Sequence, residues 1–382
     1  MNLFRANKNS LLTPILFFIV CKILIIYAGA ALFTIEQRQP PAGHWLYQAQ
    51  DTTGPFYLDL WRRWDSFYIL HIAENGYTQV PIGVIPYPTL PLYPYAIRAL
   101  TGFTQNNLLS GVIITNIAFC LALIFLWKLL CLHYDSSIAR KSLICLMLFP
   151  TSFVFSMIYT ESLFFFLAVS GFYFAYKNRW MIAGICGSLA CMTRIIGVIL
   201  VATYLVIYLE QTGFNFKKIK PNILWLGLIP FGFLGASLIQ YQYSHEHFSF
   251  IKTSDFWGRS ITWPWISVIN NIKLSREFWQ NGIFPEMGVI RIIFLVIVAT
   301  ALILGLKKLK PSYAAYLCLG LLVPLSSQNL LSFPRFIIIC FPLFVIFAIM
   351  SQNKYFFYGY IVCALPTQLY FLYKFLNWHT PF

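Results

Sequence analysis

Long apolar runs separated by short polar turns dominate this chain of 382 residues. One such run covers residues 11–33 and another covers 290–306. Apolar segments of about 17–25 residues with few charges can cross the hydrocarbon core of a bilayer as helices. The pattern therefore predicts an all-α polytopic membrane protein. Short segments of alternating polarity, typical of a membrane β-barrel, do not occur in the sequence.

The number and direction of the spans follow from the basic turns between them. Lysine and arginine residues concentrate in cytoplasmic turns of membrane proteins. Placing the turns at 177–179, 217–220 and 307–310 inside gives a consistent path with about eleven spans. The expected spans are 11–33, 107–131, two short spans between 141 and 177, two half-length helices in 180–210, and then 222–243, 290–306, 312–329, 335–351 and 355–376.

Residues 180–210 need half-length helices because they lie between two basic turns but are too few for two full spans. A break near Thr193-Arg194 places Arg194 at an outer turn. Broken helices are tolerated where they line a cavity. A single tilted span would instead place one basic cluster outside, which the charge rule disfavours.

This topology separates the acidic residues from the cytoplasmic side. Of the twelve Asp and Glu residues, only Asp135 and Glu210 fall inside. The others lie in or beside outer segments, above all a first outer loop at 34–106 and a second at 244–289. We therefore expect residues 1–382 to form a single transmembrane domain whose chemistry, if any, takes place at the outer face. The first span reads as an uncleaved signal anchor.

Composition supports this interpretation and limits the partners. The chain is 59% hydrophobic and only 10% charged, whereas soluble domains carry about 25% charged residues. The formal charge of +15 could indicate a nucleic-acid partner, but the lysine clusters lie between apolar spans. We interpret them as topology signals first and as contacts to anionic lipid headgroups second. A nucleic-acid partner is not expected.

Five charged residues are expected to meet on the outer side. They are Asp65, Glu161, Arg194, Arg259 and Arg335. Charged residues at membrane depth are costly and by default indicate a functional site. A carboxylate can take a proton from a hydroxyl nucleophile, and a guanidinium can hold an anionic leaving group such as phosphate.

Each of these residues also has a structural interpretation. Asp65, in the segment Trp61-Arg62-Arg63-Trp64-Asp65-Ser66-Phe67-Tyr68, could be a solvated partner of either arginine at the start of an interfacial helix that ends at Gly76. Glu161 could simply mark a helix start. Arg194 and Arg335 could be snorkelling anchors. Arg259, in an aromatic loop, could rest on headgroups.

Motifs for soluble donors or metals do not accompany these residues. The sequence contains no Walker loop, dinucleotide fingerprint or Gly-x-Ser-x-Gly elbow. The histidines lack metal-ligand spacing with acids or cysteines. We therefore expect neither a metal ion nor a cofactor. A donor carried on a lipid would need only the membrane.

Short motifs around the candidate residues follow one another along most of the chain. They include Arg63-Trp64-Asp65-Ser66, Pro91-Leu92-Tyr93-Pro94, Tyr159-Thr160-Glu161-Ser162, Thr193-Arg194, Phe256-Trp257-Gly258-Arg259 and Phe333-Pro334-Arg335. In the order and spacing of these motifs the chain resembles the PIG-V-type (GPI mannosyltransferase 2-like) mannosyltransferases. These are membrane glycosyltransferases of the GT-C class that add the second mannose to GPI anchors in eukaryotes. The short length and compact loops resemble the bacterial relatives. The proline that often follows the Thr-Arg pair in the family is Ile195 here.

The resemblance implies a GT-C fold and a polyprenyl-phosphate sugar donor. The sugar, expected to be mannose, would be transferred with inversion to the hydroxyl of a glycan or glycolipid acceptor. In GT-C enzymes an acid in the first outer loop is the catalytic base, and Asp65 matches it. Glu161 is expected to be a second acidic or positioning group. Substrate-binding roles are expected for Arg63, Trp64, Arg194, Trp257, Arg259 and Arg335.

The resemblance also sets the expected location. In a bacterium the protein would lie in the inner membrane with its site facing the periplasm, and in a eukaryote it would lie in the ER membrane. Two alternatives stay open. One is a transporter or flippase of lipid-linked sugars, although we find no repeated halves of the kind typical of transporters. The other is a non-catalytic scaffold subunit.

Overall fold

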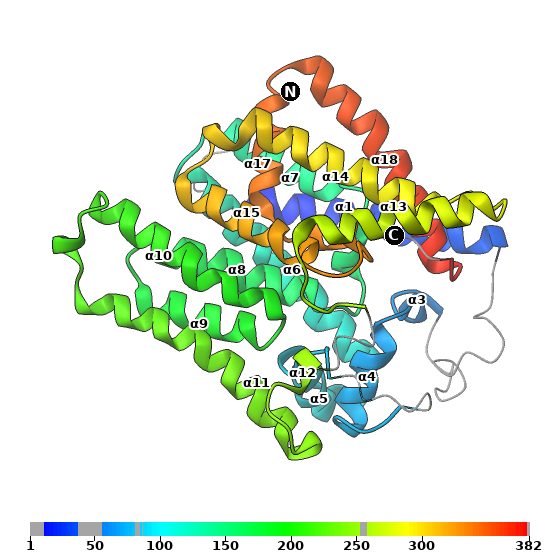
Figure 1. Ribbon diagram of the computed structural model, residues 1–382, viewed down its shortest axis with the longest axis horizontal. Coiled ribbons are helices and arrows are strands. Elements are labelled where there is room, and N and C mark those ends of the chain that lie inside the picture. Colours follow the sequence, from blue (N-terminus) through cyan, green and yellow to red (C-terminus); the bar gives the residue numbers. More distant parts are fainter. Residues whose placement is uncertain (1–10, 37–55, 81–84, 86, 253–257, 380–382) are drawn as a thin grey trace.

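Helices make up the regular structure of the described part of the chain (Figure 1). The computed structural model describes residues 11–36, 56–80, 85, 87–252 and 258–379. Within these ranges the β-type pairing is limited to one isolated bridge, between Ile261 and Ser327. The expected all-α fold is confirmed.

Five described helical segments are long and apolar enough to cross a membrane by length and composition. They are α1 (Leu12–Glu36), α6 (Asn107–Cys131), η2 (Ile195–Val198) with α10 (Ile199–Thr212), η4 (Pro221–Gly227) with α11 (Leu228–Ser244), and α14 (Glu286–Gly305) with η6 (Leu306–Lys308). Four shorter apolar helices accompany them: α8 (Glu161–Tyr176), α9 (Trp180–Cys191), α15 (Pro311–Leu325) and α17 (Phe341–Met350). The protein is thus a multi-pass membrane protein, and the count of eleven spans stays a prediction.

Most expected spans coincide with helices. The span at 107–131 is α6, the two short spans before 177 are α7 (Ser136–Leu148) and α8, and the last span is α18 (Lys354–Leu376). The expected span at 335–351 is not one continuous helix. It is divided into α16 (Phe333–Ile337) and α17, because Pro342 has no N–H and its ring would clash with the carbonyl of Ile338 in an unbroken helix.

The predicted break near Thr193-Arg194 is present between α9 and η2. Arg194 is extended, with φ −150° and ψ 142°. After the break the chain passes so close to α9 that a Cβ atom at Gly197 would lie 2.7 Å from the backbone nitrogen of Cys191. The break therefore forms without the proline that the family often places at Ile195. Close backbone approach at a glycine makes it possible.

The basic turns gather at one end of the molecule. Glu210, near the end of α10, accepts hydrogen bonds from the Tyr176 hydroxyl (2.7 Å) and from the backbone N–H of Ser312 (2.8 Å). These contacts join the end of α8, the end of α10 and the start of α15, which adjoin the turns at 177–179, 217–220 and 307–310. η3 (Phe216–Lys218) lies in the second of these turns. Glu161, at the other end of α8, is separated from Tyr176 by roughly 22 Å at 1.5 Å per residue.

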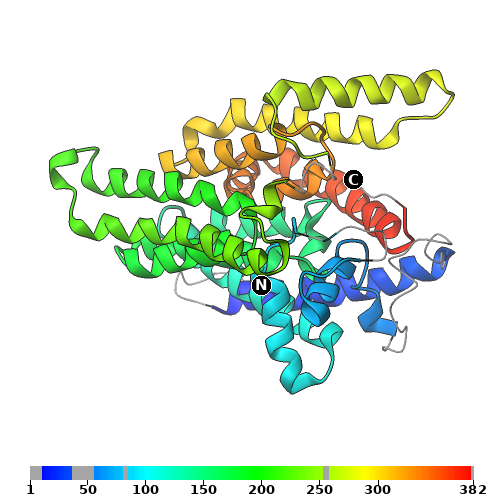
Figure 2. The ribbon, with the colours of Figure 1, turned by 60° about the horizontal axis from the view of Figure 1, so that its bottom comes forward.

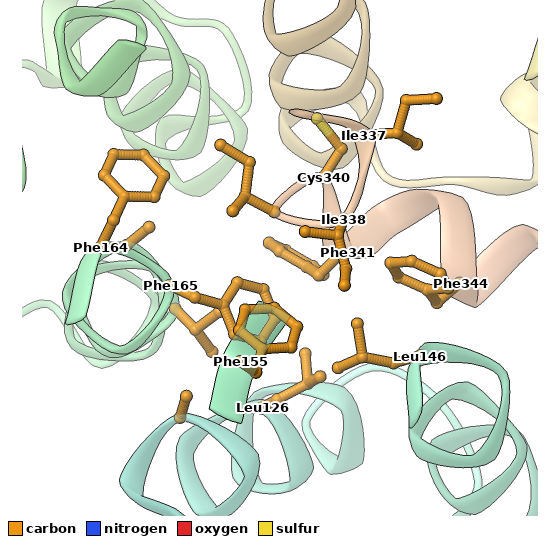
Figure 3. Packing of buried hydrophobic residues seen from close by; sticks show 14 of the residues in the cluster. Leu126, Leu146, Phe155, Phe164, Phe165, Ile337, Ile338, Cys340, Phe341 and Phe344 are labelled. Atoms are coloured by element: carbon orange, nitrogen blue, oxygen red, sulfur yellow. The ribbon is translucent and has the colours of Figure 1, made fainter. Parts of the chain in front are cut away.

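The centre of the core is built from aromatic and aliphatic side chains of several helices (Figure 3). Phe155, in the 3₁₀ turn η1 (Ser152–Ser156), lies among residues of α6, α8 and the α16–α17 connection. Its ring stacks on Phe119 of α6 at 4.5 Å. Lys22 of α1 reaches the same turn and donates to the Phe155 carbonyl (3.1 Å) and the Ser156 hydroxyl (2.7 Å). This packing fixes the turn that leads into α8.

Shorter helices occupy the two expected outer segments. The first contains α3 (Phe56–Asp59), α4 (Ser66–Asn75) and α5 (Leu92–Thr104), and the second contains α12 (Ser249–Lys252) and α13 (Pro264–Gln280). Helix α4 ends at Gly76, which has φ 74°, as predicted. It is more deeply packed than the expected surface helix, because most of its residues are buried against α5 and α6. Helix α13 runs along the edge of the molecule beside α14 (Figure 2).

Candidate active site

Asp65 stands at the N-terminal boundary of α4, and its side chain faces Arg335. The Asp65 Oδ2 atom lies 2.5 Å from Arg335 Nη1, and 46% of the Asp65 side chain is exposed. The alternative that Asp65 pairs with a neighbouring arginine is wrong, because Arg62 and Arg63 instead bind Asp59 at 2.6 and 3.2 Å. Asp65 is therefore an accessible carboxylate held by a residue distant in the sequence.

Glu161 is the first residue of α8, and its side chain is fully buried. Its Oε1 atom accepts a hydrogen bond from Arg335 Nε at 2.5 Å and lies 2.8 Å from Arg194 Nη1. The other carboxylate oxygen, Oε2, has no hydrogen-bond partner within the described part of the chain. A buried carboxylate requires such charge partners. Glu161 thus marks a helix start, as the structural interpretation expects, and also holds two guanidinium groups.

The break after α9 directs Arg194 into the protein. Its Nη1 atom donates to the Thr160 hydroxyl at 2.8 Å and pairs with Glu161, and only 13% of its side chain is exposed. A snorkelling arginine would instead extend its head toward water. The snorkelling interpretation is therefore wrong for Arg194.

Arg335 connects the two acids from the short helix α16. Its guanidinium carbon lies 4.2 Å from the centre of the Tyr159 ring, a cation–π contact, and its side chain is 9% exposed. Helix α16 is fixed in turn by the Thr151 hydroxyl, which donates to the Pro334 carbonyl at 2.9 Å. Arg335 is therefore a buried bridge between Asp65 and Glu161, which excludes the snorkelling interpretation here too.

Arg259 completes the cluster from the second outer segment. Its guanidinium carbon lies 4.8 Å from the centre of the Phe336 ring, and that of Arg194 lies 5.4 Å from the same ring. Burial lowers the pKa of Arg259 to about 10, and the negative charge of Asp65 offsets only part of this effect, so the group stays protonated at neutral pH. Within the described ranges Arg259 forms no ion pair of its own. The loop interpretation, a contact with headgroups alone, does not account for this position.

The structure does not bring Arg63 and Trp64 to this cluster through their side chains. Arg63 Nε donates to the Leu376 carbonyl (3.2 Å), and the indole N–H of Trp64 donates to the Phe375 carbonyl (3.4 Å), both at the end of α18. Substrate binding by these two residues stays a prediction. Trp257, the remaining candidate, lies outside the described residues.

Three residues of the cluster were not singled out in the sequence: Tyr159, Thr160 and Phe336. Besides stacking on Arg335, Tyr159 accepts the Asp65 backbone N–H at 3.3 Å. Each of the three lies within two positions of a predicted residue in the sequence. The motifs therefore point to these three positions, but a selection limited to charged residues leaves them out.

The arrangement suits acid–base chemistry beside an anion. Three guanidinium groups and two carboxylates meet, which leaves one excess positive charge. Such a site can accept a phosphate through charge-assisted hydrogen bonds. The half-exposed carboxylate of Asp65 lies at the edge of this positive site.

Comparison with known proteins gives a consistent result. A family model described as Mannosyltransferase (PIG-V) matches residues 12–265. The chain is also 25% identical over 247 residues to GPI mannosyltransferase 2 of two strains of Cryptococcus neoformans var. neoformans serotype D, covering 58% of this chain and 56% of theirs. The chain thus spans about half the length of these curated relatives. No solved structure matches it significantly.

Proposed function

The chain belongs to the PIG-V mannosyltransferase family, and from this premise we propose that it transfers mannose from a polyprenyl-phosphate donor to a hydroxyl group of a glycan or glycolipid. The family supports a glycosyltransferase in general. The donor, the acceptor and the side of the membrane are the parts that the proposal adds.

The observation that carries the proposal is the unequal exposure of the two acids in the charged cluster. Asp65 is 46% exposed and can meet an incoming hydroxyl, whereas Glu161 is fully buried between Arg194 and Arg335. A general base must come within hydrogen-bond reach of the proton that it takes. We therefore assign the base to Asp65. Glu161 holds the two arginines in place.

In the proposed reaction the acceptor oxygen attacks the anomeric carbon of the donor sugar while Asp65 takes the hydroxyl proton. The bond between the anomeric carbon and the phosphate oxygen breaks, and its electron pair leaves with the lipid phosphate. Attack opposite the leaving group inverts the anomeric centre. Arg335, Arg194 and Arg259 stabilise the negative charge that develops on the phosphate.

The position of the cluster supports a site that opens on the outer face. Glu161 lies at the end of α8 opposite to the basic turns, which mark the cytoplasmic side by the positive-inside rule. In a bacterium this is the periplasmic face of the inner membrane, and in a eukaryote it is the lumenal face of the ER membrane.

The test uses purified protein in lipid vesicles with radiolabelled polyprenyl-phosphate mannose and a membrane extract as the source of acceptor. We expect a new labelled glycoside together with free polyprenyl phosphate, and loss of both with Asp65→Asn. A charge-matched control is Glu246→Gln, since Glu246 forms an exposed ion pair with Lys252 at 3.0 Å. Movement of intact donor across the bilayer without bond cleavage would support the flippase alternative instead.

A further inference from the structure

Arg335 uses two different nitrogen atoms for the two acids of the cluster. Its Nε atom donates to Glu161, and its Nη1 atom donates to Asp65, each at 2.5 Å. We propose that Arg335 is a counter-ion switch: it binds the Asp65 carboxylate while the site is empty and transfers this contact to the donor phosphate, which releases Asp65 to act as the base. The inference rests on the proposed function and adds an order of events to it.

The two contacts of Arg335 differ in how easily they can exchange. Glu161 has no exposed side-chain surface, whereas Asp65 is 46% exposed. Charges attract more strongly in a buried, low-dielectric environment than beside water. A phosphate that arrives from the open side therefore displaces Asp65, and the contact between Nε and Glu161 stays.

The geometry allows this exchange without moving the guanidinium. The ring of Tyr159 lies 4.2 Å from the guanidinium carbon and holds its plane. The Tyr159 hydroxyl also accepts the backbone N–H of Asp65 at 3.3 Å. The backbone of Asp65 therefore stays in place while its side chain turns from Arg335 toward the acceptor.

The exchange also makes the whole carboxylate of the proposed base available. While Asp65 Oδ2 accepts the Arg335 N–H, the carboxylate is held toward the guanidinium, and Oδ1 is the oxygen left without this contact. A phosphate bound to Nη1 frees Oδ2 and keeps the positive charge of Arg335 compensated. Binding of the donor phosphate therefore releases the second carboxylate oxygen and lets the side chain turn toward the acceptor.

The switch predicts an unusual property of the inactive variant Asp65→Asn. Asn has nearly the shape of Asp but no charge, so it competes less well with phosphate for Arg335. We expect Asp65→Asn to bind farnesyl phosphate about three- to tenfold more tightly than the unmodified protein, an estimate reduced for the partial exposure of Asp65. The measurement is titration calorimetry of the purified protein in detergent, with uncharged farnesol as the reference ligand.

Two controls separate the switch from a general effect of charge. Glu246→Gln removes the same charge from an exposed ion pair and should leave the affinity unchanged. In a double-mutant cycle, Asp65→Asn should give no gain in an Arg335→Gln background. If that background does not fold, Arg335→Lys replaces it. Lysine keeps the charge but lacks the fork that contacts Glu161 and phosphate together, so the gain should then be smaller than with Arg335. A gain of the same size without Arg335 would overturn the switch.

The outcomes also separate the switch from the proposed function. If Asp65→Asn binds farnesyl phosphate no more tightly while the unmodified protein transfers mannose, the switch is wrong and the function stands. If Asp65→Asn gains affinity only in the presence of Arg335 but the unmodified protein transfers no mannose, the ion exchange stands and the proposed function is wrong.

Discussion

Asp65 and Glu161 allow the same chemical change to be made at an open and at a closed position of one cluster. The substitutions Asp65→Asn and Glu161→Gln each remove a negative charge and keep the shape of the side chain. Both acids bind Arg335 at 2.5 Å, but Asp65 is 46% exposed and Glu161 is not exposed at all. If exposure decides their roles, Asp65→Asn should remove activity alone, and Glu161→Gln should also lower the stability of the folded protein.

The magnitudes follow from the partners that each substitution leaves behind. Breaking a buried ion pair from one side costs about 3–5 kcal/mol. Glu161→Gln removes the carboxylate that Arg194 pairs with and leaves Arg335 with Asp65 alone, while the amide oxygen can still accept hydrogen bonds. We expect a loss of stability of about 3 kcal/mol. Asp65 is more than one-third exposed, so solvent screening limits the effect of Asp65→Asn to about 1 kcal/mol or less.

The assay is thermal unfolding of the purified variants in the same detergent, followed by tryptophan fluorescence, together with the transfer reaction. We expect Asp65→Asn to unfold close to the unmodified protein and to transfer no sugar. Glu161→Gln should unfold at a clearly lower temperature. A matched control is the double substitution Glu161→Gln with Arg194→Gln, which should recover part of the loss because one uncompensated buried charge is gone. Equal unfolding of Glu161→Gln and the unmodified protein would refute the reasoning.

Three further predictions concern residues around the site. Gly197→Ala should destabilise the protein by about 1–3 kcal/mol in thermal unfolding, since its new Cβ would lie 2.7 Å from the backbone of α9. The control Gly102→Ala should leave stability unchanged, because a Cβ atom added there would meet no neighbouring atom within 4 Å. Phe336→Leu should raise KM for the donor by about five- to thirtyfold, because the guanidinium groups of Arg194 and Arg259 lose their contact with the ring. An unchanged KM would mean that the ring does not contribute to donor binding. Arg63→Gln should lower stability by about 1–3 kcal/mol through the lost contact to the Leu376 carbonyl and leave donor KM within about twofold; a much higher KM would make Arg63 a substrate ligand.

The sequence was sufficient where one local property decides the outcome. The length of apolar runs predicted α6 at its observed bounds, and the charge of the turns predicted the break before Arg194. Where several weak signals compete, the sequence was not sufficient. The division between α16 and α17 depends on Pro342 within an otherwise apolar stretch, and the apolar character dominated the expectation.

The partners of the charged residues were harder to predict than their approximate location. That Asp65, Glu161 and the arginines meet on one side followed from span counting. The sequence did not show that Asp65 forms no ion pair with Arg62 or Arg63. Both arginines pair with Asp59 instead. Local spacing also does not show that Arg63 extends toward the end of α18. Such choices depend on packing between segments distant in the chain.

Arg335 shows why the C-terminal part of the chain matters for the proposed chemistry. The family match ends at residue 265, so it includes Asp65, Glu161, Arg194 and Arg259 but not Arg335. Those four residues alone carry two positive and two negative charges, which gives no net attraction for an anion. Arg335 supplies the excess positive charge and contacts both acids. An anionic donor would therefore be held more strongly once α16 has packed against the turn before α8, so that donor binding depends on residues beyond the family match.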